Sequence, residues 1–251
     1  MARPHGEDVV IPYDEDVPIS REFCRSAIPS FFAVAAYFLS WIGTLGCEFI
    51  KFEILPTNYN NNTTTTEDPK TVHFGIWYRQ SVESYPDSGG EGGRRYNIVS
   101  TCTGYGDNIN IDPSWIAARA FSTLVLILGA IALLLALVTC CCCANQKYAL
   151  NVDLLNGGIY LVVTLFQGLT LIILSSKLCQ NNDYIRQMMG QENGCNLSGG
   201  AKCIIYATVF WFLAGVFSCN SFRAERKKKM EARKKSLVIT DASPSTELLL
   251  P

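Results

Sequence analysis

The chain has 251 residues, of which 49% are hydrophobic and 17% are charged, and its formal net charge is −1. This length would suit one or two ordinary soluble domains, but the apolar residues occur in long blocks instead of at the spacing of amphipathic elements. The two histidines, His5 and His73, lie far apart in sequence, and neither has a nearby pair of cysteines. The sequence therefore offers little material for a metal site or a histidine-based catalytic triad, and we expect no cofactor.

Four apolar blocks are long enough to cross a bilayer as helices, which takes about 20 residues each. They cover residues 27–46, 116–141, 155–175 and 203–222. Buried helices of soluble proteins this long nearly always carry some charge, whereas the central stretches of these blocks carry none. We therefore predict an all-α membrane protein, with a four-helix bundle over residues 27–222.

The polar tail at residues 1–26 precedes the first block. That block is too long for the apolar region of a cleavable signal peptide, so we expect it to act as an uncleaved signal anchor. Arg21 and Arg25, next to the block, favour a cytoplasmic tail.

The tail after the fourth block is also expected on the cytoplasmic side. Residues 223–235 hold eight basic and two acidic residues, and basic residues beside a span favour the cytoplasmic side. Both termini are then cytoplasmic, in the plasma membrane or another membrane of the secretory pathway. We expect the basic segment to lie against anionic lipid, at about 1 kcal/mol per basic residue near the surface. Residues 236–251 are polar and expected to be disordered.

This topology gives two outer loops, residues 47–114 and 176–202, and a short cytoplasmic loop at 142–153. Tetraspanins carry their large loop between the third and fourth spans, so this pattern disfavours a tetraspanin. The three sequons for N-glycosylation all fall in the two loops expected to lie outside, which agrees with the charge bias. These sequons are at Asn61, Asn62 and Asn196.

The first outer loop contains three segments typical of strands, at residues 48–54, 71–79 and 95–101, because they alternate or are rich in β-branched and aromatic side chains. An Asn/Thr-rich tract at 58–66 and a glycine-rich turn at 87–93 separate them. We predict a small antiparallel sheet above the bilayer.

Two short motifs stand out, Gly75, Ile76 and Trp77 in the first outer loop and Ala-Ala-Arg-Ala at residues 117–120. The first is similar to the Gly-Leu-Trp segment of the claudin and peripheral myelin protein superfamily, and the second resembles the Ala-Ala-Arg-Ala-Leu with which claudins enter their second span. The four-span topology and the loop lengths are also similar. The resemblance implies a structural contact between Arg119 and the outer sheet, whereas the residues alone fit an arginine that reaches the membrane interface equally well. Without the resemblance, Trp77 would be interpreted as an aromatic residue that only packs against its neighbours.

The chain departs from the superfamily at Gln80, where claudins have a cysteine three residues after the tryptophan. The first loop has two cysteines, and the resemblance implies that an equivalent of the family disulfide would join Cys47 to Cys102. The missing cysteine weakens the expectation of a claudin-type pore or barrier, whereas the four-span scaffold is still expected.

Further cysteines occupy two other regions. Cys179 and Cys195 are plausible disulfide partners in the second loop, with Cys203 as a competitor, because disulfides persist in an oxidising compartment. Four adjacent cysteines end the second block and are candidates for S-palmitoylation, although an apolar run that happens to use cysteine is the alternative. They are Cys140, Cys141, Cys142 and Cys143.

The block interiors suggest a plain scaffold. Ala36, Ser40 and Thr44 form a small-residue face that lets helices approach closely. Gln167 is the main polar residue deep in a block, and we expect it to bond across the bundle. No block has an acidic or basic residue near its middle, which disfavours a transporter or pump.

The leading hypothesis is a non-enzymatic, claudin-like protein that mediates protein–protein contacts, in adhesion or barrier organisation, through its outer loops. Its partners would be the lipid bilayer and other membrane proteins or itself, without nucleic acid. The alternative is an auxiliary subunit that modulates a channel or receptor. A membrane enzyme is disfavoured, because no acid–base or nucleophile set lies in or near the blocks.

Overall fold

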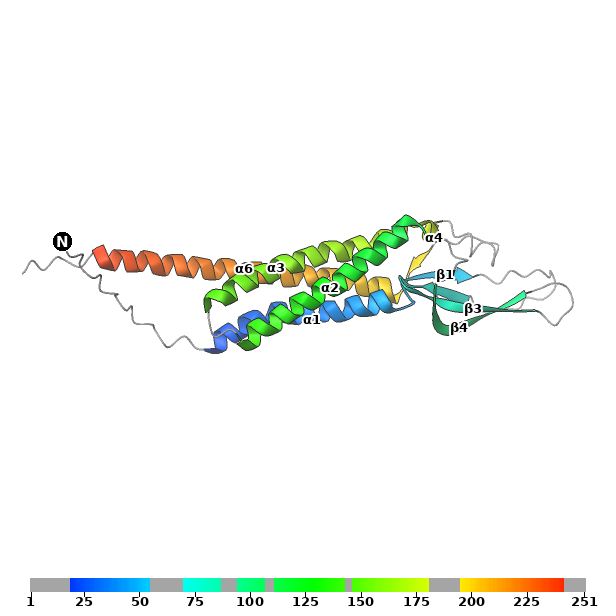
Figure 1. Cartoon of the computed structure of the whole chain (residues 1–251), viewed down its shortest axis with the longest axis horizontal. Helices are drawn as coiled ribbons and strands as arrows, with labels where there is room; N and C mark the ends of the chain where they lie inside the picture. The colour runs from blue at the N-terminus through cyan, green and yellow to red at the C-terminus, as the bar shows by residue number, and fades with distance from the viewer. Residues whose placement is uncertain are drawn as a thin grey trace, which may run out of the picture.

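The computed structural model describes residues 19–54, 70–86, 94–106, 111–142, 146–180 and 195–241. Four long helices lie side by side, and a sheet extends from one end of the bundle (Figure 1). A 3₁₀ helix, η1, and a short helix, α4, follow the third long helix. The helices are α1 (Ile19–Leu45), α2 (Pro113–Cys142), α3 (Gln146–Leu169), η1 (Thr170–Ser175), α4 (Lys177–Gln180) and α6 (Gly199–Asp241).

Each long helix contains a segment that is long and apolar enough to cross a membrane. The segments are Ala27–Leu45, Pro113–Val138, Leu154–Ser175 and Gly199–Ala232. Each overlaps one of the four blocks predicted from the sequence. The prediction of a mostly helical chain with four such helices and a small antiparallel sheet is therefore confirmed.

The bundle interior combines small residues with a few large aromatic ones. Ala36, Ser40 and Thr44 are fully buried, so the predicted small-residue face of α1 does face the bundle. The Ser40 hydroxyl donates to Gln167 Oε1 at 2.7 Å and accepts from Trp211 Nε1 at 3.2 Å. Gln167 therefore bonds across the bundle, as predicted, and this polar cluster links α1, α3 and α6.

The sheet has five strands in the order β4-β3-β2-β1-β5, all antiparallel. The first four come from the segment between α1 and α2, called the first loop below. The fifth comes from the segment between α3 and α6, called the second loop, and it pairs with β1 through Ile50 and Leu197. The strands are β1 (Ile50–Ile54), β2 (Lys70–Phe74), β3 (Tyr78–Pro86), β4 (Arg94–Gly104) and β5 (Asn196–Leu197).

Two features of the sheet differ from the sequence prediction. The single strand expected at residues 71–79 is wrong: β2 ends at Phe74 and β3 begins at Tyr78, so the intervening residues form a turn. The Gly75 N–H closes this turn by donating to the Tyr78 carbonyl at 2.7 Å. The sheet is also not confined to the first loop, because the second loop supplies β5. The tract at 58–66 and the turn at 87–93 lie outside the described residues.

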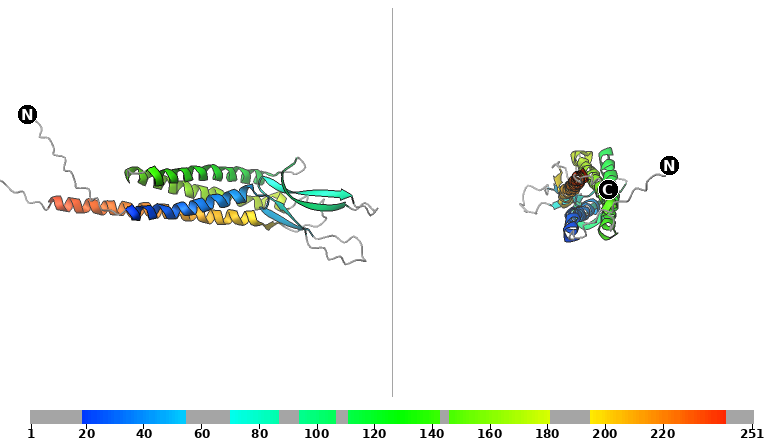
Figure 2. Two further views of the ribbon diagram at one scale, coloured as in Figure 1. Left: turned by 90° about the horizontal axis from the view of Figure 1, so that it is seen from below. Right: turned by 90° about the vertical axis from the view of Figure 1, so that its left-hand side faces the viewer.

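Three helices run well past their predicted ends. Helix α3 begins at Gln146, within the cytoplasmic loop predicted at 142–153. Helix α1 begins at Ile19, within the predicted tail at 1–26. Helix α6 continues without a break through the basic segment to Asp241, so residues 236–241 are helical where the sequence predicted disorder. The left view in Figure 2 shows the extension of α6 at the end of the bundle opposite the sheet.

Candidate functional site

The turn at Gly75, Ile76 and Trp77 lies where the sheet meets the bundle. Gly75 is packed so closely that a Cβ atom there would lie 2.8 Å from Cys47 Cα and 2.8 Å from the Tyr78 carbonyl oxygen, and would also overlap the Gly46 carbonyl oxygen. Only glycine fits without a backbone shift. The next side chain, Ile76, is fully buried in the core between sheet and helices.

The carbonyl groups of this turn accept hydrogen bonds from three side chains. The Ile76 oxygen accepts from Trp115 Nε1 at 3.1 Å and from Arg119 Nε at 2.9 Å. The Gly75 oxygen accepts from the Tyr105 hydroxyl at 2.6 Å. Turn carbonyls that would otherwise be buried without partners are thus satisfied by the start of α2 and by the residue just after β4.

Aromatic rings hold the guanidinium group of Arg119. Its Cζ atom lies 5.1 Å from the ring centroids of both Trp77 and Tyr105, within the range of cation–π attraction. The Tyr105 ring in turn meets the Trp115 ring edge-on at 5.5 Å. Of the two interpretations of Arg119 from the sequence, the structure supports the contact with the sheet. Trp77 is more than a packing aromatic, since it is one of the two rings on this cation.

Tyr105 is a neutral hydrogen-bond donor in this cluster. Burial raises the pKa of its phenol well above the usual value near 10, and the nearby positive charges of Arg119 and Arg79 oppose that rise only in part. The protonated form therefore persists at physiological pH and can donate to Gly75. We refer to Gly75, Ile76, Trp77, Tyr105, Trp115 and Arg119 as the junction cluster.

Asp112 ties the junction cluster to the second loop. Its Oδ1 accepts from the Trp115 N–H at 3.2 Å and so caps the first turn of α2. Its Oδ2 accepts from the Lys177 N–H, at the start of α4, at 3.0 Å. Neither Asp112 nor Tyr105 was identified from the sequence. The pattern Asp-Pro-Ser-Trp, an N-cap residue followed by proline at the first helical position, could have revealed the former.

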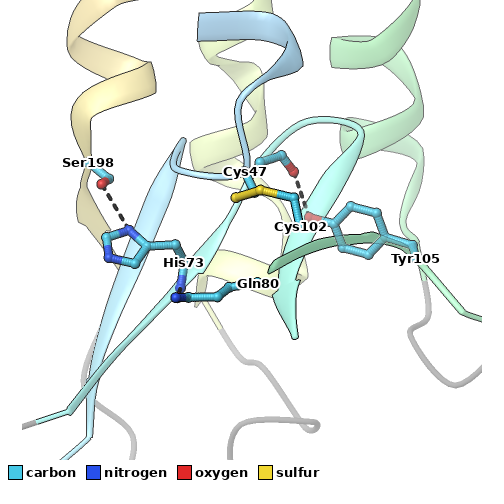
Figure 3. The surroundings of a disulfide bond; sticks show 7 residues. Cys47, His73, Gln80, Cys102, Tyr105 and Ser198 are labelled. Atoms are coloured by element: carbon cyan, nitrogen blue, oxygen red, sulfur yellow. Dashed lines mark hydrogen bonds between the residues drawn. A yellow bond between two sulfur atoms is a disulfide. The ribbon is translucent and has the colours of Figure 1, made fainter. Parts of the chain in front are cut away.

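Both expected cysteine pairs are brought together. Cys47 and Cys102 form a disulfide with Cα atoms 5.8 Å apart, and Cys179 and Cys195 form another with Cα atoms 5.1 Å apart. Cys203, the competing partner, lies on α6 and is not in a disulfide. Figure 3 shows that the first disulfide lies close to Tyr105 and Gln80.

Gln80 occupies an informative position. It lies directly opposite Cys102 in the pairing of β3 with β4. A cysteine here would face Cys102 across the two strands, but in this chain Cys102 bonds to Cys47 at the end of α1 instead. Gln80 Oε1 accepts from the backbone N–H of His73 on β2 at 3.2 Å (Figure 3). The side chain at position 80 thus joins neighbouring strands by a hydrogen bond.

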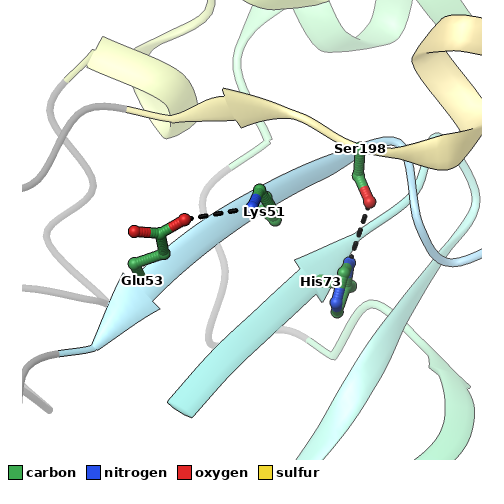
Figure 4. Close-up of polar contacts among 4 residues, drawn as sticks. All are labelled: Lys51, Glu53, His73 and Ser198. Carbon is green, nitrogen blue, oxygen red and sulfur yellow. Dashed lines mark hydrogen bonds and ion pairs between the residues drawn. The ribbon is translucent and has the colours of Figure 1, made fainter. Parts of the chain in front are cut away.

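His73 also reaches the second loop. Its Nδ1 lies 3.1 Å from the Ser198 hydroxyl oxygen, which follows β5 (Figure 4). In the same view, Lys51 and Glu53 form an ion pair at 3.0 Å on β1. The hydrogen bond adds to the pairing of β5 with β1, so the second loop is fixed to the sheet at two points.

The remaining predicted residues are spread over the molecule. Asn196 is exposed on β5, while Asn61 and Asn62 lie outside the described residues. Cys140, Cys141 and Cys142 are in the last turn of α2, and Cys143 lies outside the described residues. Over the described ranges, no group of histidine, cysteine and acidic residues is arranged to hold a metal ion.

No protein-family model and no curated protein matches the sequence.

Proposed function

We propose that this chain is a claudin-like four-span membrane protein that makes protein–protein contacts, for adhesion or barrier organisation, through its sheet. The junction cluster carries the proposal. The two motifs that resemble the superfamily are far apart in sequence, yet Arg119 of one donates to the backbone of Ile76 in the other at 2.9 Å. A chance resemblance of two short motifs would not require them to touch.

Placement in a bilayer is supported by the outer surface of the bundle. Large apolar side chains point away from it on all four long helices, including Phe31 at 70%, Leu134 at 62%, Leu165 at 61% and Phe212 at 51% exposure. A continuous apolar surface of this kind is unfavourable in water but matches the hydrocarbon core of a membrane. The basic residues that follow on α6 favour cytoplasmic tails and contact with anionic lipid, and in the orientation that we propose the sheet lies outside the cell or in the lumen of the secretory pathway.

The rigid attachment of the sheet to the helices suits a role in binding other proteins, without catalysis. Two disulfides, the junction cluster and the His73–Ser198 hydrogen bond fix it to the ends of the helices. Strand β4 is at one edge of the sheet and exposes residues 101–104. Edge strands and rigid sheets present backbone groups and side chains to a partner at little entropic cost.

N-glycosylation at the predicted sequons gives a first test of this orientation. We propose that Asn196 is glycosylated, because it is exposed and belongs to a sequon in the second loop. The Asn196→Gln variant should lose one glycosidase-sensitive mobility shift. Asn61→Gln and Asn62→Gln test the first loop in the same way. Absence of any shift in the wild type would contradict the orientation.

The contact function is tested by mixing two cell populations that express the protein with different fluorescent tags. We expect enrichment of both tags where unlike cells touch. Gly75→Ala, which disturbs the attachment of the sheet to the helices, should abolish the enrichment, whereas Gly158→Ala, at an open position on α3 and away from the sheet, should keep it. No enrichment, together with stoichiometric recovery of an ion channel or receptor in mild detergent, would instead support the auxiliary-subunit alternative.

A further inference from the structure

An open groove runs between α2 and α3 on the outer surface of the bundle, and we call it the α2–α3 groove. Its volume is about 610 Å³, within the range of about 300–1,000 Å³ that is typical of small-molecule sites. It is lined by Leu128 on α2 and by Leu154, Leu155, Gly158, Ile159 and Val162 on α3. None of these side chains can form a hydrogen bond, so the groove suits an apolar occupant.

The groove lies where the two helices separate. Figure 1 shows α2 and α3 as antiparallel helices that meet near α4 and diverge toward the end opposite the sheet. Closer to the sheet, the rings of Phe121 and Phe166 stack across the two helices with centroids 5.8 Å apart. Counting equally far onward from Phe121 and back from Phe166 leads to Leu128 and Ile159. Both are partly buried against the bundle core, so they form the floor of the groove.

A row of α3 residues gives the groove its shape. Leu154, Gly158 and Val162 follow one another at intervals of four residues, so they share one face of the helix. Leu154 and Val162 project outward, at 45% and 44% exposure. Between them, no atom lies within 4 Å of the place that a Cβ on Gly158 would occupy. The notch is one residue wide, which admits a hydrocarbon chain, whereas a closely packed helix needs several small residues on the facing surface.

The length and depth of the groove match one leaflet of a bilayer. Leu154 begins the apolar segment Leu154–Ser175, and Ile173, near the other end of that segment, packs in the core that includes the sheet. From Leu154 to Val162 the helix rises about 12 Å, at 1.5 Å per residue. One leaflet contributes about 15 Å, which is half of a hydrocarbon core of about 30 Å. The groove therefore spans most of the leaflet that is farther from the sheet.

We propose that the α2–α3 groove binds one acyl chain of a phospholipid in the leaflet farther from the sheet. A chain in the groove contacts two helices at once, whereas a chain on the convex surface of a single helix contacts only one. The additional dispersion contacts favour the groove over the rest of the bundle surface. The proposal rests on the bilayer placement proposed above and is independent of what the sheet contacts.

Photolabelling can compare the groove with a matched position elsewhere on the bundle. Val162 lines the groove, and Val209, on α6, is not among its lining residues. Their exposures are similar, at 44% and 49%, and the contact of the Tyr160 and Trp211 rings at 5.6 Å puts them at the same depth. The full-length protein would be irradiated in phosphatidylcholine nanodiscs that contain some phosphatidylcholine with a diazirine near the end of one acyl chain. We expect several-fold more adduct at Val162 than at Val209 by mass spectrometry.

Two variants on the same helix test whether the notch is the site. Gly158→Leu fills the notch and should lower the adduct at Val162 to the level at Val209. Gly168→Leu, at an open position outside the groove, should leave the adduct at Val162 unchanged. Gly158→Ala adds only one methyl group and should lower the adduct less than Gly158→Leu.

The wild-type protein alone gives the results that would overturn the proposal. Equal adduct at Val162 and Val209 would remove the site and leave the bilayer placement standing. Less adduct at Val162 than at Val209 would assign the groove to a helix of a second copy. Loss of the Val162 adduct on addition of cholesterol, with the Val209 adduct unchanged, would assign it to a sterol. Absence of adduct at both valines would overturn the site and the bilayer placement together.

Discussion

Arg119 Nε donates to the carbonyl oxygen of Ile76 at 2.9 Å, and the two residues are 43 positions apart in the chain. The bond joins the second long helix to the turn between β2 and β3. Trp115 Nε1, one helical turn earlier on α2, donates to the same oxygen at 3.1 Å. Two donors on one face of a helix therefore fix both the position and the direction of the turn.

Arg119→Ala should destabilise the folded protein by about 1–3 kcal/mol, because it removes a hydrogen bond to a buried carbonyl and the cation between two rings. Arg119→Lys should lie between wild type and alanine, since lysine keeps the charge but not the planar group that stacks on both rings. Thermal unfolding in detergent, followed by tryptophan fluorescence, measures this. Lys202→Ala, at an exposed position on α6, is the control, and equal effects at both positions would contradict the assigned role.

Gly75→Ala should be more disruptive than its size suggests. The added methyl group would contact the backbone of Gly46, Cys47 and Tyr78, and backbone cannot move aside as a flexible side chain can. Overpacking of this kind costs about 1–3 kcal/mol or more. Gly104→Ala is a matched control, because nothing lies within 4 Å of the place that its methyl group would occupy. The yield of monodisperse protein and its Tm should fall for the first variant and not for the second.

Tyr105 predicts a loss of stability at alkaline pH. Burial raises the pKa of its phenol in the folded state above the unfolded value of about 10. The stabilisation is therefore fully present below about pH 10 and decreases as the pH rises from there towards the folded-state pKa. Tyr105→Phe should lower the Tm at neutral pH by removing the hydrogen bond to Gly75, and should weaken the dependence of Tm on pH above about 9. Parallel curves for wild type and variant would count against this.

The sequence predicted the helices better than the sheet, for a physical reason. An apolar run of about 20 residues is a signal within one segment, and all four long helices overlap their predicted blocks. Strand β5 has two residues and is defined by its pairing with β1 of another loop, which no local pattern contains. The turn at Gly75 was likewise hidden, because the neighbouring β-branched and aromatic residues form one run that is rich in strand formers.

The junction cluster was only half predictable. The resemblance drew attention to Trp77 and Arg119, but their contact depends on how β3 and α2 meet in space. Tyr105 gave no signal, since a tyrosine after a strand has many possible roles. The continuation of α6 was missed because a basic segment is polar on every side, and a polar helix offers no apolar periodicity to detect.

The two disulfides lead to a graded prediction. The Cys47–Cys102 bond closes a loop with a sequence separation of 55, against 16 for Cys179–Cys195. Loop-closure entropy then gives about 4 kcal/mol for the first and about 3 kcal/mol for the second. The double variant Cys47→Ala with Cys102→Ala should therefore lower the Tm more than Cys179→Ala with Cys195→Ala.

Alkylation before and after reduction checks the pairing on which this ranking depends. In the denatured, unreduced protein, Cys203 and Cys219 should react at once, whereas the four paired cysteines should react only after reduction. If Cys195 were labelled without reduction and Cys203 were protected, the second-loop bond would be Cys179–Cys203. Such a bond would attach the second loop to the first turns of α6 and leave β5 to be held by its pairing with β1 and by the contact between Ser198 and His73.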